Sequence, residues 1–212
     1  MNRNGLQISL SQQAYKLIRH KIVTLELEPG AVIDEAELRG ELGLGRTPIR
    51  EALQRLALEK LVSIVPRRGM FVTEIGITDL QRLFEMRVVL ESKAAELAAL
   101  RGTAAHWAEM AELLDDLPEP TDLANNIALM EIDETCHRII YDAADNEFLT
   151  DTLNMLFALS LRLWHFSLAN VADMEGAVIE HQRILAALQA KDAEQAAALM
   201  GKHVQHFQTE IQ

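Results

Sequence analysis

The stretch that decides the fold is LGLGRTPIREALQRLALEKLVSIVPRRG, residues 42–69. Apolar residues recur at helical spacing from Ile49 to Leu61, which predicts a helix with one buried face. The pattern then changes, because VSIV and the nearby MFVTEI are short β-branched runs on either side of PRRG. Such runs indicate a hairpin with a basic tip.

Two further helices are expected before this stretch. SQQAYKLIRHKIVTLEL, residues 11–27, has a helical apolar stripe, with Ser11 as the expected N-cap and a Pro-Gly turn after it. EAELRGEL, residues 35–42, follows Asp34 as its N-cap and ends at Gly43.

The start of the third helix has two interpretations. Either Thr47 is the N-cap and Pro48 the first helical residue, or Gly45 is the cap. Three helices with a tight turn between the second and third, followed by a hairpin, predict a winged helix-turn-helix.

From residue 77 onward the apolar periodicity is helical throughout. Short connections between amphipathic helices predict an antiparallel bundle. The chain is therefore expected to be mainly α, with a winged helix-turn-helix DNA-binding domain in residues 1–75 and an all-helical domain in residues 76–212. Six helices are expected in the second domain, over residues 78–101, 104–116, 121–144, 147–170, 175–190 and 193–210.

The charge of the chain divides at the same point. Residues 1–75 hold 11 Lys+Arg and 9 Asp+Glu, whereas residues 76–212 hold 9 and 23, within a formal net charge of -12. This asymmetry indicates two domains with different partners. The single cysteine, Cys136, cannot form an internal disulfide, and there is neither a signal peptide nor a run long enough to span a membrane. We therefore expect a cytoplasmic protein.

Basic residues lie at the two elements that face DNA in this motif. Arg46, Thr47 and Arg50 are at the start of the third helix, and Arg67 and Arg68 are at the tip of the wing. The planar arginine fork donates two parallel hydrogen bonds to phosphate or guanine, and the free N–H groups of a helix N-terminus attract phosphate. The alternative is that these are solvated charges, with Arg50 paired to a nearby glutamate. Their placement at both elements favours double-stranded DNA as a partner.

A second group of polar residues is spread over three helices of the bundle. Asp133 and His137 are four residues apart and so share one helix face, while His181 and His203 are in register with apolar residues and should point inward. An aspartate with three imidazoles suits a divalent ion such as zinc, nickel or manganese. The alternative for each histidine is a core side chain bonded to a backbone carbonyl. Spacing alone leaves both interpretations open.

The first domain resembles a known family. Residues 17–72 are similar to the winged-helix domain of GntR-type bacterial transcription regulators, through the LGxxRTPxREAL core, the upstream PG turn and the RRG wing. The resemblance implies base and phosphate contacts by Arg46 and Arg50, a phosphate contact by Thr47, and the wing turn at Gly69.

The second domain resembles the FCD ligand-binding domain that accompanies many such winged helices. DETCHRIIYDAADNEFL, residues 133–149, is similar to its D-x-x-x-H helix, and residues 180–204 are similar to its closing EH…GD…H pattern. Cys136 is expected to pack rather than to bind the ion. The resemblance implies a set of four metal ligands: Asp133, His137, His181 and His203.

In this family a small carboxylate is thought to occupy the open positions of the ion. Arg87 and Arg162 are the candidates to hold it, because both are expected to lie among inward-facing residues and an arginine can bind a carboxylate bidentately. The alternative for each is an internal ion pair, such as Arg87 with Glu91.

A metal with open positions would also suit a hydrolase, but there is no H-E-x-x-H motif, nucleophile elbow or phosphate loop. Glu180, the nearest substitute for a general base, is adjacent to His181 on its helix and is expected to point away. A purely structural metal in a helical domain is a further alternative. The fusion to a DNA-reading domain favours a metabolite-responsive transcriptional regulator, a repressor rather than an enzyme, that binds a palindromic operator as a homodimer.

Overall fold

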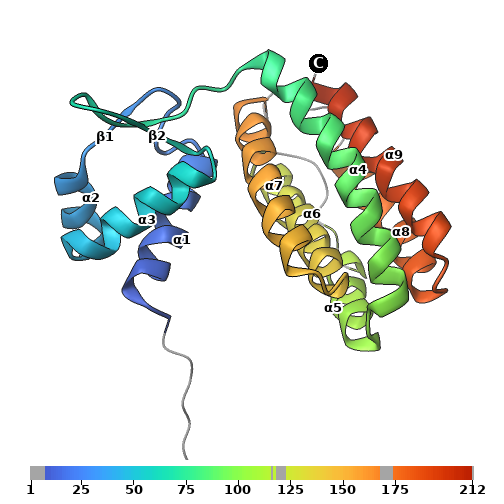
Figure 1. Cartoon of the computed structure of the whole chain (residues 1–212). Coiled ribbons are helices and arrows are strands. Elements are labelled where there is room, and N and C mark those ends of the chain that lie inside the picture. Colours follow the sequence, from blue (N-terminus) through green and yellow to red (C-terminus); the bar gives the residue numbers. More distant parts are fainter. Residues whose placement is uncertain (1–7, 116, 118–122, 168–173, 212) are drawn as a thin grey trace, which may run out of the picture. The chain divides into compact units, whose positions relative to one another are not determined.

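The computed structural model describes residues 8–115, 117, 123–167 and 174–211 (Figure 1). The chain divides into two compact units, Met1–Gly76 and Ile77–Gln212, and each is described by itself. Helices dominate the described residues, as the sequence predicts, and the strands form one small sheet in the first unit. None of the described helices combines the length and the apolar character that crossing a membrane requires.

The first unit combines helices with a three-stranded antiparallel sheet. The strand order is β1-β3-β2, with Val32 opposite Phe71 and Val62 opposite Val72. The predicted helices and hairpin are confirmed, whereas the two-residue strand β1 is too short to leave a period-two pattern in the sequence. In chain order the elements are α1 (Leu10–Val23), β1 (Val32–Ile33), α2 (Glu35–Leu42), α3 (Arg46–Leu58), β2 (Val62–Val65) and β3 (Gly69–Val72).

The caps of the first two helices match the predictions in part. Ser9, not Ser11, is the N-cap of α1, since the Ser9 side chain accepts a hydrogen bond from the Gln12 amide. The predicted caps of α2 are confirmed. The Asp34 carboxylate accepts bonds from two first-turn amides, and Gly43 ends the helix with a φ of 64°, a conformation that glycine adopts without steric cost.

Gly45 is the N-cap of α3, so of the two predicted starts the one with Thr47 as the cap is wrong. Pro48 is then the third helical residue, which is tolerated because the first-turn amides have no partner within the helix. The inner face of α3 packs on α1 and is fully buried at Ile49 and Leu53. This packing holds the first turn of α3 at the surface.

The wing is the hairpin of β2 and β3. Its turn is closed by a hydrogen bond from the Arg68 amide to the Val65 carbonyl. Arg67 has a φ of 62° and Gly69 a φ of 112°. Only glycine adopts the second conformation readily, so Gly69 is required by the turn itself.

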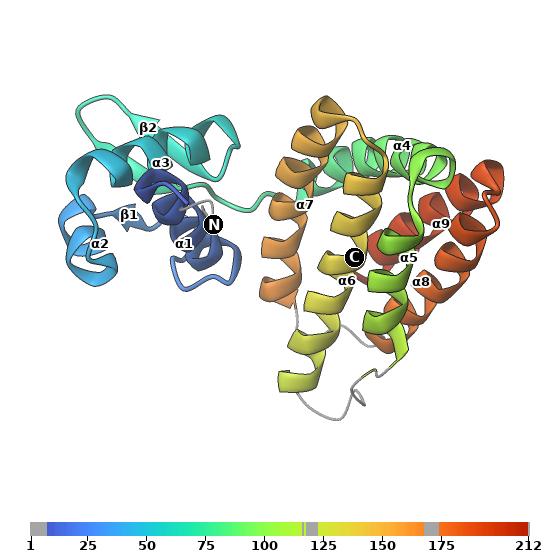
Figure 2. The ribbon, with the colours of Figure 1, turned by 90° about the horizontal axis from the view of Figure 1, so that it is seen from below.

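The second unit is a bundle of six helices among its described residues, as the sequence predicts (Figures 1 and 2). Helix α4 packs along α9, and α6 packs against both α4 and α8. The helix bounds differ from the predicted ones by at most a few residues, and the predicted ends at residues 116, 121 and 170 lie outside the described residues. The helices are α4 (Ile77–Arg101), α5 (Ala104–Asp115), α6 (Leu123–Ala143), α7 (Glu147–Ser167), α8 (Met174–Gln189) and α9 (Ala193–Ile211).

The interior of the bundle is mostly apolar. Aliphatic side chains make up most of it, and the Trp164 and Phe207 rings lie against each other at a tilt of 57°, with their centroids 3.6 Å apart. Several ionisable side chains nevertheless lie in the core, although such groups are seldom fully buried unless they are paired. They are Arg87, Glu91, Asp133, His137, Arg162, His181 and His203.

Candidate metal centre and nucleic-acid interface

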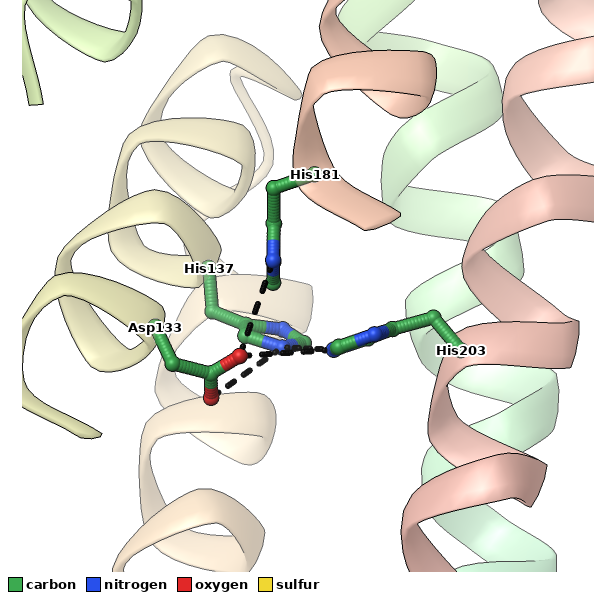
Figure 3. A group of neighbouring side chains, drawn as sticks. All are labelled: Asp133, His137, His181 and His203. Carbon is green, nitrogen blue, oxygen red and sulfur yellow. Dashed lines mark hydrogen bonds and ion pairs between the residues drawn. The ribbon is translucent and has the colours of Figure 1, made fainter. Parts of the chain in front are cut away.

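The structure brings together the four residues that the sequence selects as metal ligands. Asp133 and His137 lie one turn apart on α6, His181 comes from α8 and His203 from α9, and each is at most 2% exposed. Their side chains point toward one another in Figure 3. Each residue offers one ligand atom such that all four atoms lie within 4.8 Å of one another. We call this group the Asp–His cluster.

The distances within the Asp–His cluster are close to those between ligands of a single ion. His137 Nε2 lies 3.1 Å from His203 Nε2, and Asp133 Oδ1 lies 3.4 Å from His203 Nε2. Asp133 also approaches His181 Nδ1 at 3.6 Å. Ligands bound at about 2.1 Å to one ion lie roughly 3.0–3.4 Å apart in octahedral or tetrahedral geometry. Small adjustments of the side chains would therefore accommodate an ion.

Two buried atoms of the cluster make no hydrogen bond among the described residues: Asp133 Oδ1 and His181 Nε2. Buried polar atoms are usually satisfied, and an exception calls for an explanation such as an ion. A carboxylate oxygen and an imidazole nitrogen are both good donors to zinc, nickel or manganese. The residues present therefore fit a divalent ion.

The electrostatics of the cluster keep its donors in different protonation states. Burial alone would raise the pKa of Asp133, but the neighbouring imidazoles hold it well below its usual value. Burial, reinforced by the nearby His203, lowers the pKa of His181, which keeps this imidazole neutral and able to bind a metal. Burial would also lower the pKa of His203, but the neighbouring carboxylates of Asp133 and Glu180 raise it to about 9.

Two glutamates that sequence reasoning does not assign to the site touch the outer side of these imidazoles. Glu91 Oε2, on α4, lies 2.5 Å from His137 Nδ1, and Glu180 Oε2 lies 2.9 Å from His203 Nδ1. Glu180 is not one of the four clustered ligand residues, as expected, but it touches the cluster from outside through His203. It diverges from its neighbour on α8 but reaches a histidine on α9, a contact that the sequence of one helix does not encode.

Cys136 is buried and directly precedes His137 in the sequence. Among the described residues, its sulfur is not one of the clustered ligand atoms. Burial, together with the charge of Asp133, raises the pKa of its thiol, so the thiol stays protonated. This agrees with a packing role, because it is the thiolate that binds metals.

The two arginines selected as carboxylate partners are both buried, each 2% exposed. Arg87 forms the alternative ion pair, with its Nε 2.5 Å from Glu91 Oε1 and its guanidinium 4.6 Å from the centre of the Phe157 ring. Through Glu91 it is joined to His137. Arg162 lies on α7 and is also part of the core.

The residues selected for DNA contact are exposed in the first unit. Arg46, Thr47 and Arg50 lie at the surface of the first turn and a half of α3, while the intervening Ile49 is buried. Arg50 Nε donates to both carboxylate oxygens of Glu35, at 2.9 and 3.2 Å, so the alternative of a local ion pair is also present. This contact uses one edge of the guanidinium. The three wing residues selected from the sequence are also exposed: Arg67, Arg68 and Gly69.

Comparison with known proteins supports the same division of the chain. Residues 10–72 match the family described as bacterial regulatory proteins, gntR family, and residues 82–206 match the FCD domain. The HTH-type transcriptional repressor RspR of Escherichia coli K12 is 26% identical over 202 residues, which cover 95% of this chain and 89% of that protein. The HTH-type transcriptional regulator McbR of the same strain is 28% identical over 189 residues, covering 88% and 86%.

Solved structures show the same architecture. The structure of E. coli McbR/YncC superposes with a TM-score of 0.83 at 25% identity and covers 97% of this chain and 98% of its own. A putative GntR regulator from Rhodococcus sp. RHA1 has the same fold, with a TM-score of 0.72 at 21% identity. The relatives are DNA-binding transcriptional regulators and not enzymes. The chain thus belongs to the gntR family of bacterial regulatory proteins and carries an FCD domain.

Proposed function

We propose that this regulator is a repressor that senses a small carboxylate at a divalent metal ion in its helical unit. The observation that carries the proposal is the Asp–His cluster, four buried donors from three helices whose ligand atoms lie within 4.8 Å of one another. A cluster built only for packing would not leave Asp133 Oδ1 and His181 Nε2 without hydrogen bonds. The repressor assignment is supported by the similarity to RspR, a transcriptional repressor.

The DNA-binding part of the proposal rests on the exposed basic residues of α3 and the wing. As in other winged helices, α3 would enter the major groove, with Arg46 and Arg50 at bases and phosphates and Thr47 at a phosphate. Arg67 and Arg68 would follow the neighbouring backbone, with Gly69 shaping their turn. A homodimer would place two such units on the halves of a palindromic operator. Such a protein acts on the chromosome, so we place it in the cytoplasm.

The sensing part rests on the number of protein donors. Zinc, nickel or manganese can accept more than four ligands, so an ion held by the Asp–His cluster would supply Lewis acidity and open positions for carboxylate oxygens. Arg87 and Arg162 are the proposed partners of that carboxylate, because both are cations in the core of the same unit. Since Arg87 already pairs with Glu91, its use by an effector would require an exchange of carboxylates.

The effector would act by favouring one arrangement of the dimer over another. A ligand shifts such an equilibrium only by the difference between its affinities for the two states. Coupling of about 1–3 kcal/mol would change operator occupancy by roughly 5–150-fold.

Operator binding by the full chain tests the proposal. DNA sites are first selected from a random pool by the zinc-loaded protein, and binding is then titrated with a panel of small mono-, di- and tricarboxylic acids. We expect a palindromic site and at least one acid that changes its affinity, with the response lost after treatment with a chelator. A response that persists in the chelated protein would place the effector elsewhere, and failure to enrich any site would contradict the DNA-binding role. If the metal is purely structural, no acid in the panel should change the affinity for the operator.

A further inference from the structure

Two of the three imidazoles in the Asp–His cluster are held from outside by a carboxylate on a different helix. His137 on α6 is approached at Nδ1 by Glu91 of α4, at 2.5 Å, and more distantly by the Tyr141 hydroxyl, at 3.3 Å. His203 on α9 bonds through Nδ1 to Glu180 of α8, at 2.9 Å. In both rings the opposite nitrogen, Nε2, faces the cluster, where the two Nε2 atoms lie 3.1 Å apart.

This arrangement has a chemical consequence for any ion bound by the rings. A neutral imidazole carries one proton, and an acceptor on Nδ1 holds that proton there and leaves the lone pair of Nε2 free for the metal. A carboxylate in that position also increases the basicity of the ring and fixes its orientation. The third imidazole, His181, has no outer carboxylate of this kind among the described residues: its Nδ1 lies 3.3 Å from the Ala177 carbonyl and 3.6 Å from Asp133 of the cluster itself.

We propose that Glu91 and Glu180 are the positioning residues of the metal site, which hold His137 and His203 in the tautomer and orientation that bind the ion. The inference rests on the proposed function, because it requires that a metal binds. It adds α4 to the site, although none of the four ligands comes from that helix. Glu91 is fully buried and anchored by Arg87, whereas Glu180 is partly exposed and also bonds His206 on the surface of α9, at 3.1 Å.

The surroundings of Glu180 make it the cleaner residue to change. It sits at the edge of the core, so Glu180→Ala should fold, and it removes the acceptor of His203 without touching a ligand. His206→Ala is the matched control, because it breaks the other bond of the same carboxylate. If Glu180 merely fastened α8 to α9, each variant would weaken zinc binding through the lost contacts between the helices, and neither would alter the surroundings of the bound ion.

The experiment is a zinc titration of the full chain in competition with a chromophoric chelator. We expect Glu180→Ala to weaken zinc binding by about 10–100-fold, the usual effect of removing such an outer partner, and His206→Ala to change it by much less. Substitution by cobalt should give a visible absorption spectrum that is altered in Glu180→Ala and unaltered in His206→Ala. Glu180→Gln, which keeps an acceptor oxygen, should restore part of the affinity.

For Glu91, the variant is Glu91→Gln, which keeps the volume of the side chain. This variant leaves the charge of Arg87 unpaired. If that prevents folding, the double variant Arg87→Met with Glu91→Gln, which removes both charges, is used in its place. Weaker zinc binding by a folded variant is expected. Zinc affinity within about two-fold of wild type in both Glu180→Ala and the Glu91 variant, or equal losses in Glu180→Ala and His206→Ala, would overturn the inference. If the wild type itself binds no zinc, the proposed function fails instead.

Discussion

The two units of this protein place their functional charges in opposite environments. In the winged helix, Arg50 is exposed, and its ion pair with Glu35 lies at the surface. In the bundle, Asp133 and the three imidazoles are almost completely buried and touch one another. Exposed charges can be exchanged for DNA phosphates at little cost, whereas buried ones are stable only when each is matched by a partner. The difference is what DNA binding by the first unit and the proposed metal site in the second would require.

Removal of a cluster ligand should give the largest effect. His181→Ala deletes one of four donors, so zinc affinity should fall by more than the roughly 10–100-fold caused by loss of an outer partner. The stabilisation that zinc confers on the wild type, about 2.7 kcal/mol at 100 times Kd, should disappear with it. Elemental analysis and thermal melting measure the two effects. One full equivalent of metal in the variant would contradict the ligand assignment.

Removal of a DNA-facing arginine should have a smaller effect, confined to the other unit. Arg50→Ala should weaken operator binding by roughly ten-fold or more and lower the slope of log affinity against log salt. Zinc content should not change, because Arg50 lies in the winged helix. A salt-controlled anisotropy titration provides the measurement, and an unaltered operator affinity would remove this residue from the interface.

Zinc binding should release a proton at neutral pH. The pKa of His203 is raised to about 9 in the metal-free chain, so this ring is protonated at pH 7.5 and must lose about one proton to bind the ion. Zinc affinity should therefore rise with pH up to about 9 and then level off. Calorimetry in buffers of different ionisation enthalpy counts the proton, and an identical heat in all buffers would exclude its release.

The folding stability of the metal-free chain should depend on pH in the opposite direction. The stabilisation from protonated His203 is complete below pH 6.5 and is lost as the pH rises through about 9.

The smallest effect is expected from the acid beside the DNA-facing arginines. Glu35→Ala frees Arg50 from its ion pair and removes a negative charge near the expected phosphate path. Affinity for non-specific DNA should rise slightly, by less than about five-fold, because exposed ion pairs are weak. Glu41→Ala, on the same helix but paired with Lys21, is the control. A large loss of operator binding would instead show that Glu35 orients Arg50.

The sequence predicts most of the fold because caps and periodicity are local. Asp34, Gly43 and the apolar stripe of α3 each act within one helix, and their predictions are confirmed. Where two local signals compete, as with Ser9 and Ser11, the pattern does not select between them. Helix register places Asp133 and His137 on one face, but their convergence with residues of α8 and α9 was implied only by family resemblance.

The contacts of the two outer glutamates could not be predicted at all. Neighbouring residues on a helix point in directions about 100° apart, so Glu180 beside His181 looked unrelated to the cluster. Its contact with His203 depends on how α8 packs against α9. In the same way, Glu91 is recognisable in the sequence as a partner for Arg87, but its contact with His137 requires the packing of α4 on α6.

The proposed effector is a carboxylate that binds through a metal held by the Asp–His cluster. Thermal melting of the full chain, with a panel of small carboxylic acids, tests this directly when zinc-loaded and chelator-treated protein are compared. We expect at least one acid to raise the melting temperature of the zinc-loaded protein and the same acid to have no effect on the chelated protein. An acid that stabilises both forms equally, or a panel that stabilises neither, would contradict this proposal.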